Sequence, residues 1–135
     1  MKYKSFIAAL VAMVLLLAGC SQKRADISRE EIVTAYEAAG YIVSTDVYDE
    51  KLDYGQIAYV QADHPDGDYI YFLFFETEEA AEKYKRQFYH PVTMGLFSVL
   101  FGEPSWQCWE VYGCIVAQYD VPEYMKPFEG IMKNP

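Results

Sequence analysis

The sequence predicts an α+β domain, in which an antiparallel sheet of about four or five strands carries helices packed mainly on one face. Two observations on local pattern support this class: strand-forming segments follow one another across turn residues, and helix-start signals separate the groups of strands. A third observation is the composition: 135 residues with 53% hydrophobic and 17% aromatic side chains suffice for one packed core.

The first element is a helix that begins at Ser28. Ser28 with Glu31 three residues later forms a capping-box pattern, and Gly40 marks the end of the helix. The apolar side chains between them recur at helical spacing, at Ile32, Ala35, Tyr36 and Ala39.

Strands are predicted next at Tyr41–Tyr48, Gln56–Gln61 and Tyr69–Phe75. Between the last two, Pro65, Asp66 and Gly67 have the chemistry of a type I turn and indicate a hairpin. The segment Tyr69–Phe75 is apolar or aromatic on both faces, which is typical of a central strand covered on both sides.

A second helix is predicted to open at Thr77, with acidic residues in its first turn and basic residues later. Its apolar stripe consists of Ala80, Ala81, Tyr84 and Phe88. The apolar segment Pro91–Gly102 follows, and we expect a buried helix or helical turn there because it is too short to span a bilayer.

The last elements are a hairpin around Cys108 and Cys114 and a short C-terminal helix broken or kinked at Pro127. The element order resembles a rearranged ferredoxin-like layout, which implies an antiparallel sheet.

The N-terminus reads as a targeting segment. Lys2 and Lys4 precede an apolar run of 14 residues, Phe6–Gly19, whereas a spanning helix needs roughly 20. The residues that close the run, Leu17-Ala18-Gly19-Cys20, resemble the bacterial lipobox. The resemblance implies that residues 1–19 are a lipoprotein signal peptide, that residues 20–27 are the lipidated cysteine and tether, and that residues 28–135 form the single α+β domain.

In lipoproteins of this kind the cysteine thiol takes a diacylglyceryl group, Leu17, Ala18 and Gly19 serve signal peptidase recognition, and Cys20 becomes the first residue. Fatty acyl chains such as palmitate would then hold the domain on the extracytoplasmic side of a membrane. The alternative is an ordinary cleaved signal peptide or an uncleaved anchor, with Cys20 incidental. The chain also resembles the small uncharacterised lipoproteins that many bacteria export, which implies location and not activity.

Net charge excludes one class of partner. Without the segment before Cys20, nine basic and twenty acidic side chains remain. Such a surface repels phosphate backbones, so we expect no binding to nucleic acid.

Assigning Cys20 to lipid leaves Cys108 and Cys114 as a candidate disulfide. A loop at residues 110–112 would place the two cysteines opposite each other, whereas a loop at Tyr112-Gly113 would turn them to opposite faces and forbid the bond. The alternative is that both are small buried hydrophobes.

Evidence for a metal or catalytic site is weak. Asp63, Asp66 and Asp68 share one loop, but their spacing fails the EF-hand pattern, so a solvated turn is the favoured interpretation. His64 and His90 have no partner at metal-binding spacing. We therefore expect no cofactor, no metal and no catalytic residue.

Aromatic residues provide the candidate binding surface. Its members are Tyr54, Tyr59, Tyr69, Tyr71, Trp106 and Trp109. Together they would suit a sugar, peptide or protein partner, or else would form the amphipathic edge of the core.

These observations predict a membrane-anchored lipoprotein of the cell envelope whose small acidic domain is a non-catalytic binding module. One alternative is an envelope enzyme, hydrolase-like, with a site assembled from scattered residues. Another is an accessory subunit of an envelope complex, docking through the segment Pro91–Gly102.

Overall fold

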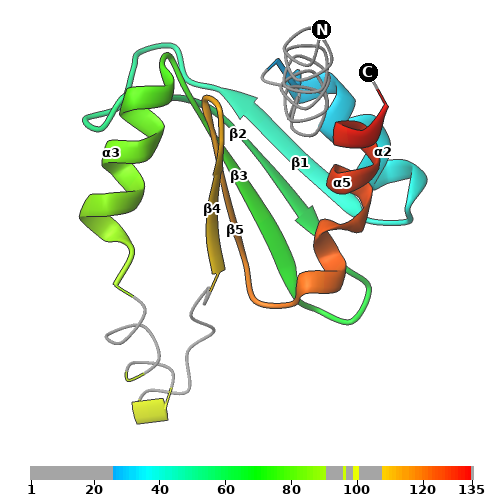
Figure 1. Ribbon diagram of the computed structural model, residues 1–135. Helices are drawn as coiled ribbons and strands as arrows, with labels where there is room; N and C mark the ends of the chain where they lie inside the picture. The colour runs from blue at the N-terminus through cyan, green and yellow to red at the C-terminus, as the bar shows by residue number, and fades with distance from the viewer. Residues whose placement is uncertain (1–25, 91–95, 97–98, 101–107, 135) are drawn as a thin grey trace, which may run out of the picture.

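A single open sheet of five antiparallel strands organises the domain (Figure 1). The computed structural model describes residues 26–90, 96, 99–100 and 108–134. In these residues the strands are β1 (Ile42–Val47), β2 (Gln56–Asp63), β3 (Tyr69–Phe75), β4 (Cys108–Tyr112) and β5 (Ile115–Tyr119), in the spatial order β1-β2-β3-β5-β4. The predicted α+β class is confirmed.

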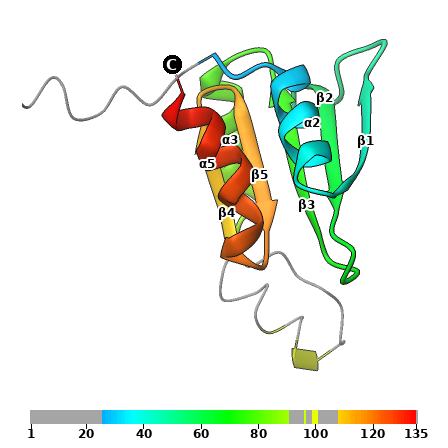
Figure 2. The ribbon, with the colours of Figure 1, turned by 90° about the vertical axis from the view of Figure 1, so that its right-hand side faces the viewer.

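Helices lie on both faces of this sheet. Helix α2 (Arg29–Ala38) and helix α5 (Lys126–Lys133) pack together over one face, which we call the closed face, and α3 (Glu78–Phe88) packs on the other, the α3 face (Figures 1 and 2). Two of these three helices therefore share one face, as expected, and α3 lies on the other. The central strand β3 is apolar on both sides and therefore needs cover on both.

The chain crosses over between β3 and β4 through α3, and β5 lies between those two strands. Because β5 is antiparallel to both neighbours, β3 and β4 run in the same direction. This is a split βαβ arrangement, which ferredoxin-like layouts also contain.

Both predicted helix starts are confirmed. Glu31 N–H donates to Ser28 Oγ at 3.2 Å, and Ser28 N–H donates to the Glu31 carboxylate at 2.9 Å, which completes the capping box of α2. Ala80 N–H donates to Thr77 Oγ1 at 3.1 Å at the start of α3. Local side-chain chemistry therefore fixes where these helices begin.

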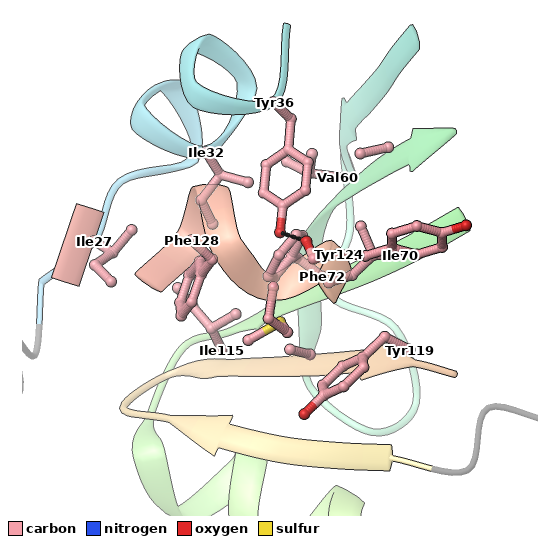
Figure 3. Packing of buried hydrophobic residues seen from close by; sticks show 13 residues of the cluster. Ile27, Ile32, Tyr36, Val60, Ile70, Phe72, Ile115, Tyr119, Tyr124 and Phe128 are labelled. Carbon is pink, nitrogen blue, oxygen red and sulfur yellow. Dashed lines mark hydrogen bonds between the residues drawn. The ribbon is translucent and has the colours of Figure 1, made fainter. Parts of the chain in front are cut away.

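The closed face carries the larger core cluster (Figure 3). Its fully buried side chains include Ile32, Tyr36, Val60, Ile70, Phe72 and Phe128. The Tyr36 hydroxyl donates to the carbonyl of Tyr124 at 2.7 Å, and burial raises the pKa of that hydroxyl well above its usual range. The hydrogen bond satisfies the only polar group of a side chain that is otherwise sealed from water.

The C-terminal segment differs from its prediction. A 3₁₀ turn, η1 (Pro122–Met125), leads directly into α5, and Pro127 stands in the first turn of α5 instead of breaking a helix. A proline is tolerated there because the first helical N–H groups have no intrahelical acceptor.

The segment Pro91–Gly102 lies mostly outside the described residues. The structure describes Leu96, Val99 and Leu100 of it, and all three side chains are exposed, contrary to the expectation of burial.

Candidate functional site

Helix α3 covers only part of its face of the sheet. It packs against β3, β4 and β5, where Ala81 closes over Leu73, Phe75 and Val116. Trp109 of β4 lies in the same cluster, with its ring stacked 5.7 Å from Tyr84 and 5.8 Å from Tyr89. This half of the α3 face is therefore hydrophobic core.

The other half of the α3 face, over β1 and β2, is lined by partly exposed polar and aromatic side chains. Strand register determines which residues share this face, because residues directly opposite each other point the same way. Asp46 opposes Tyr59, Gln61 opposes Tyr71, and Asp63 opposes Tyr69. The polar and aromatic side chains near Tyr59 form what we call the tyrosine surface: Asp46, Tyr48, Tyr59, Gln61, Asp63, Tyr69 and Tyr71. Ile42 and Ser44 of β1 share this face and border the set.

Ring contacts run across the tyrosine surface from β3 to β1. The Tyr59 and Tyr71 rings stack with centroids 5.4 Å apart and planes at 21°, and the Tyr48 ring lies 6.0 Å from Tyr59. Burial, together with a hydrogen bond to Tyr48, raises the pKa of the Tyr71 hydroxyl well above its usual range. The Tyr71 hydroxyl therefore stays neutral near pH 7, and as a neutral hydroxyl it can both donate and accept hydrogen bonds.

Carboxylates border the tyrosine surface. The Gln61 amide donates to Asp63 Oδ1 at 2.8 Å and so holds that carboxylate in place. Burial raises the pKa of the Tyr69 hydroxyl, and the negative charges of Asp120 and Asp63 raise it further. Asp46 is exposed on the β1 side.

The charge of this surface selects among ligands. The side chains that β1, β2 and β3 place on the α3 face include aspartates but no lysine or arginine. Tyrosine hydroxyls can donate to or accept from a polar ligand, and the carboxylates attract a cationic ligand and repel an anionic one.

The six aromatic residues predicted from the sequence do not all meet. Tyr59, Tyr69 and Tyr71 lie together on the tyrosine surface, whereas Trp109 shares their face but is 6% exposed and belongs to the core under α3. Trp106 lies outside the described residues. Sequence reasoning did not include Tyr48 in the candidate surface. Because alternate residues of a strand point to the same face, continuing the strand two residues past Asp46 would have placed Tyr48 on the same face as Asp46.

Tyr54 belongs to a separate cleft between the β1–β2 connection and α3. Its ring contacts that of Phe88 at 4.6 Å. The cleft, of about 500 Å³, is lined by Lys51, Asp53, Tyr54, Gly55, Ala80, Lys83, Tyr84 and Gln87. Lys51 is paired there with Glu76 at 2.7 Å.

The structure does not contain the candidate Cys108–Cys114 disulfide, because both cysteines are free thiols. Tyr112 pairs with Ile115, so the hairpin turn is Gly113-Cys114, one residue beyond the predicted two-residue loop. Gly113 has φ +58° at the first turn position, as a type II′ turn requires. Cys114 therefore lies in the turn, while Cys108 opposes Tyr119 at the other end of β4.

The loop that carries Asp63, Asp66 and Asp68 forms the β2–β3 turn. Its closure comes from hydrogen bonds of His64 N–H to the Asp68 carbonyl at 2.8 Å and of Gly67 N–H to the His64 carbonyl at 2.9 Å. His64 Nδ1 lies 3.3 Å from Asp66 Oδ2. In the part of the chain that the structure describes, no three acidic, histidine or cysteine side chains gather in a way that could hold a metal ion.

In comparisons with known proteins, no protein family, no curated protein and no solved structure matches this chain. Among the helices of residues 26–90 and 108–134, none is long and apolar enough to cross a bilayer.

Proposed function

We propose that this protein is a lipid-anchored binding protein of the bacterial cell envelope, with the tyrosine surface as its binding site. The observation that carries the binding role is the uncovered half of the α3 face, where Tyr48, Tyr59 and Tyr71 form a continuous set of ring contacts. Tyrosine is enriched in protein interfaces because it combines contact area with a hydrogen-bonding group at low entropic cost.

The anchoring role rests on Leu17-Ala18-Gly19-Cys20. Each buried CH₂ of an acyl chain contributes about 0.8 kcal/mol to membrane binding, so two chains hold a protein stably where one does not. Lipid on Cys20 would keep the acidic domain near the membrane while its charge keeps it off anionic headgroups.

Anchoring is tested by Cys20→Ser. We expect the variant protein to leave the membrane fraction or to accumulate as a larger precursor, and to lose incorporation of labelled palmitate. Unchanged mature size and unchanged membrane fractionation would refute lipidation.

Binding is tested by site-specific photocrosslinking in intact cells. A photoreactive amino acid at Ser44 lies beside the tyrosine surface, and the same amino acid at Thr34 lies on the exposed side of α2, over the closed face. We expect a discrete crosslinked product from Ser44 and none from Thr34. Equal products at both positions, or no product from Ser44, would contradict a binding role for this face.

A further inference from the structure

Strand β1 is an edge strand of the sheet, and its register shows which of its backbone N–H and C=O groups point toward β2 and which point outward. It pairs with β2 on one side (Figure 2). The register continues past the strand, where Tyr48 N–H donates to the Ile57 carbonyl at 2.9 Å. In an antiparallel ladder, hydrogen-bonded and non-bonded pairs alternate. The backbone groups of Ser44 and Asp46 therefore face β2, and those of Val43, Thr45 and Val47 face outward.

One outward group is already occupied. Val47 N–H donates to Oδ1 of Asp46 at 2.8 Å. Among residues 26–90 and 108–134, no hydrogen bond occupies the outward N–H and C=O groups of Val43 and Thr45, so another strand could pair with this part of the edge. Sheet edges of this kind accept extended peptides through main-chain hydrogen bonds, and the neighbouring side chains set the specificity.

The side chains on the two sides of β1 differ in chemistry. On the α3 face, β1 places Ile42, Ser44 and Asp46, which are all exposed, and the tyrosine surface lies behind Asp46. On the closed face, Val43 packs against the core and Val47 is 52% exposed. The Arg29 guanidinium, 3.3 Å from Thr45 Oγ1 and 3.3 Å from Glu30, lies on that closed side. A strand added near Asp46 would meet a carboxylate on the α3 face, and on the closed face it would meet the apolar side chains of Val43 and Val47 beside one guanidinium.

We propose that the outer edge of β1 binds an extended peptide segment in which basic residues alternate with apolar ones. Its backbone pairs with Val43 and Thr45, its basic side chains lie beside Asp46 and the tyrosine surface, and its apolar side chains lie beside Val43 and Val47. The proposal rests on the proposed binding function and names the partner's chemistry. Charge complementarity favours it, because the tyrosine surface carries aspartates and no cation.

The test uses the full mature protein in neutral detergent micelles and a defined probe, the capped hexapeptide Lys-Val-Lys-Val-Lys-Val. Two peptides serve as controls: Glu-Val-Glu-Val-Glu-Val reverses the charge, and Lys-Pro-Lys-Pro-Lys-Pro keeps the charge but lacks the backbone N–H groups of the valine positions. With ¹⁵N-labelled protein, we expect the Lys-Val peptide to shift the amides of Val43 and Thr45 and to slow their hydrogen exchange. We expect neither control to do so, and binding of the Lys-Val peptide to weaken as salt is raised.

Two variants separate backbone pairing from charge. Val43→Pro removes an outward N–H while leaving the bonds to β2 intact, a position where edge strands tolerate proline, and Val43→Thr is its matched control. We expect Val43→Pro to weaken binding by about tenfold, the scale of one lost hydrogen bond, and Val43→Thr to leave it unchanged. Asp46→Asn keeps an oxygen for Val47 N–H but removes the charge, so it should lower affinity and reduce the dependence on salt. If Val43→Pro unfolds, the wild-type amide shifts and the Asp46→Asn result still decide the proposal.

The proposal is overturned if the Lys-Val peptide shifts only tyrosine-surface amides, if the Glu-Val peptide binds equally well, or if no peptide binds at millimolar concentration. Each of these results leaves the proposed function standing as long as crosslinking from Ser44 persists. Loss of the Ser44 crosslink together with absence of peptide binding would overturn both.

Discussion

Tyr36 and Tyr71 lie on opposite faces of the same sheet and show two uses of one residue type. Tyr36 belongs to α2 and is fully buried between that helix and the sheet, and its hydroxyl donates to the Tyr124 carbonyl. Tyr71 is partly exposed beside Tyr59, on a part of the α3 face that borders water. The difference shows that helix coverage, more than residue type, decides whether an aromatic side chain serves the core or a surface.

The same contrast extends to the neighbours of the two tyrosines. Around Tyr36, the rings of Phe72 and Tyr41 make edge contacts at 5.4 Å and 5.0 Å within a closed cluster. Around Tyr71, the neighbouring side chains on β1 and β2 carry carboxylate, amide and hydroxyl groups. Stability should therefore depend more on the closed face than on the tyrosine surface, and recognition should depend on the tyrosine surface.

The largest effect should come from the closed face. Phe128 is fully buried and stacks on Phe72 at 5.1 Å. Phe128→Ala removes a large ring from a packed interior, so we expect a loss of about 3–5 kcal/mol in the free energy of unfolding. Urea denaturation measures it. A loss of less than about 1 kcal/mol, within the range of ordinary point substitutions, would show that α5 is not an essential cover of this face.

A smaller effect is expected at the hydroxyl of Tyr36. Tyr36→Phe leaves the Tyr124 carbonyl without its donor at 2.7 Å, which should cost about 1–3 kcal/mol. Val60→Ala, on the same face, offers a comparison in which no hydrogen bond is lost.

Alkaline pH tests the same group. Burial raises the pKa of the Tyr36 hydroxyl in the folded state. The contribution of this hydroxyl to the free energy of unfolding is therefore fully present below the unfolded pKa of about 10, and it is lost as pH rises toward the folded pKa. Tyr36→Phe should flatten the fall in stability above about pH 10. An identical slope in wild type and variant would contradict the assigned burial.

The smallest effect should be the coupling between Tyr59 and Tyr71. A double-mutant cycle with alanine at both positions should give a coupling of about 0.5–1.5 kcal/mol, as stacked rings do. The pair Tyr59 and Phe128, on opposite faces, is the control and should be additive within about 0.5 kcal/mol. Additivity within that limit for Tyr59 and Tyr71 as well would mean that their stacking contributes nothing measurable.

Much of the fold follows from local signals in the sequence. Ser28 and Thr77 begin helices because their side chains accept backbone N–H groups that no helix can satisfy internally. The strand Tyr69–Phe75 has its predicted bounds and lies at the predicted central position, because a strand that is apolar on both faces must be covered on both sides. These features depend on neighbours along the chain, which the sequence shows directly.

Features that depend on distant contacts were not predictable. The position of α3 on the face opposite α2 and the strand order β3-β5-β4 both depend on contacts between distant segments, which local patterns do not reveal. The hairpin turn at Gly113-Cys114 required knowing which of several registers packs Ile115 inward. Tyr59 and Trp109 look equivalent in sequence, yet only the second lies under a helix.

The central claim is that one face of the sheet is structural core and the open half of the other is a surface for recognition. Tyr71 and Phe72 are neighbours on β3 and point to opposite faces, so Tyr71→Ala and Phe72→Ala compare the two faces at nearly the same place in the sheet. Equilibrium urea unfolding should give a loss of about 3–5 kcal/mol for Phe72→Ala and about 1 kcal/mol for Tyr71→Ala. Equal losses of the larger size would show that Tyr71 is core and would contradict the assignment of the tyrosine surface.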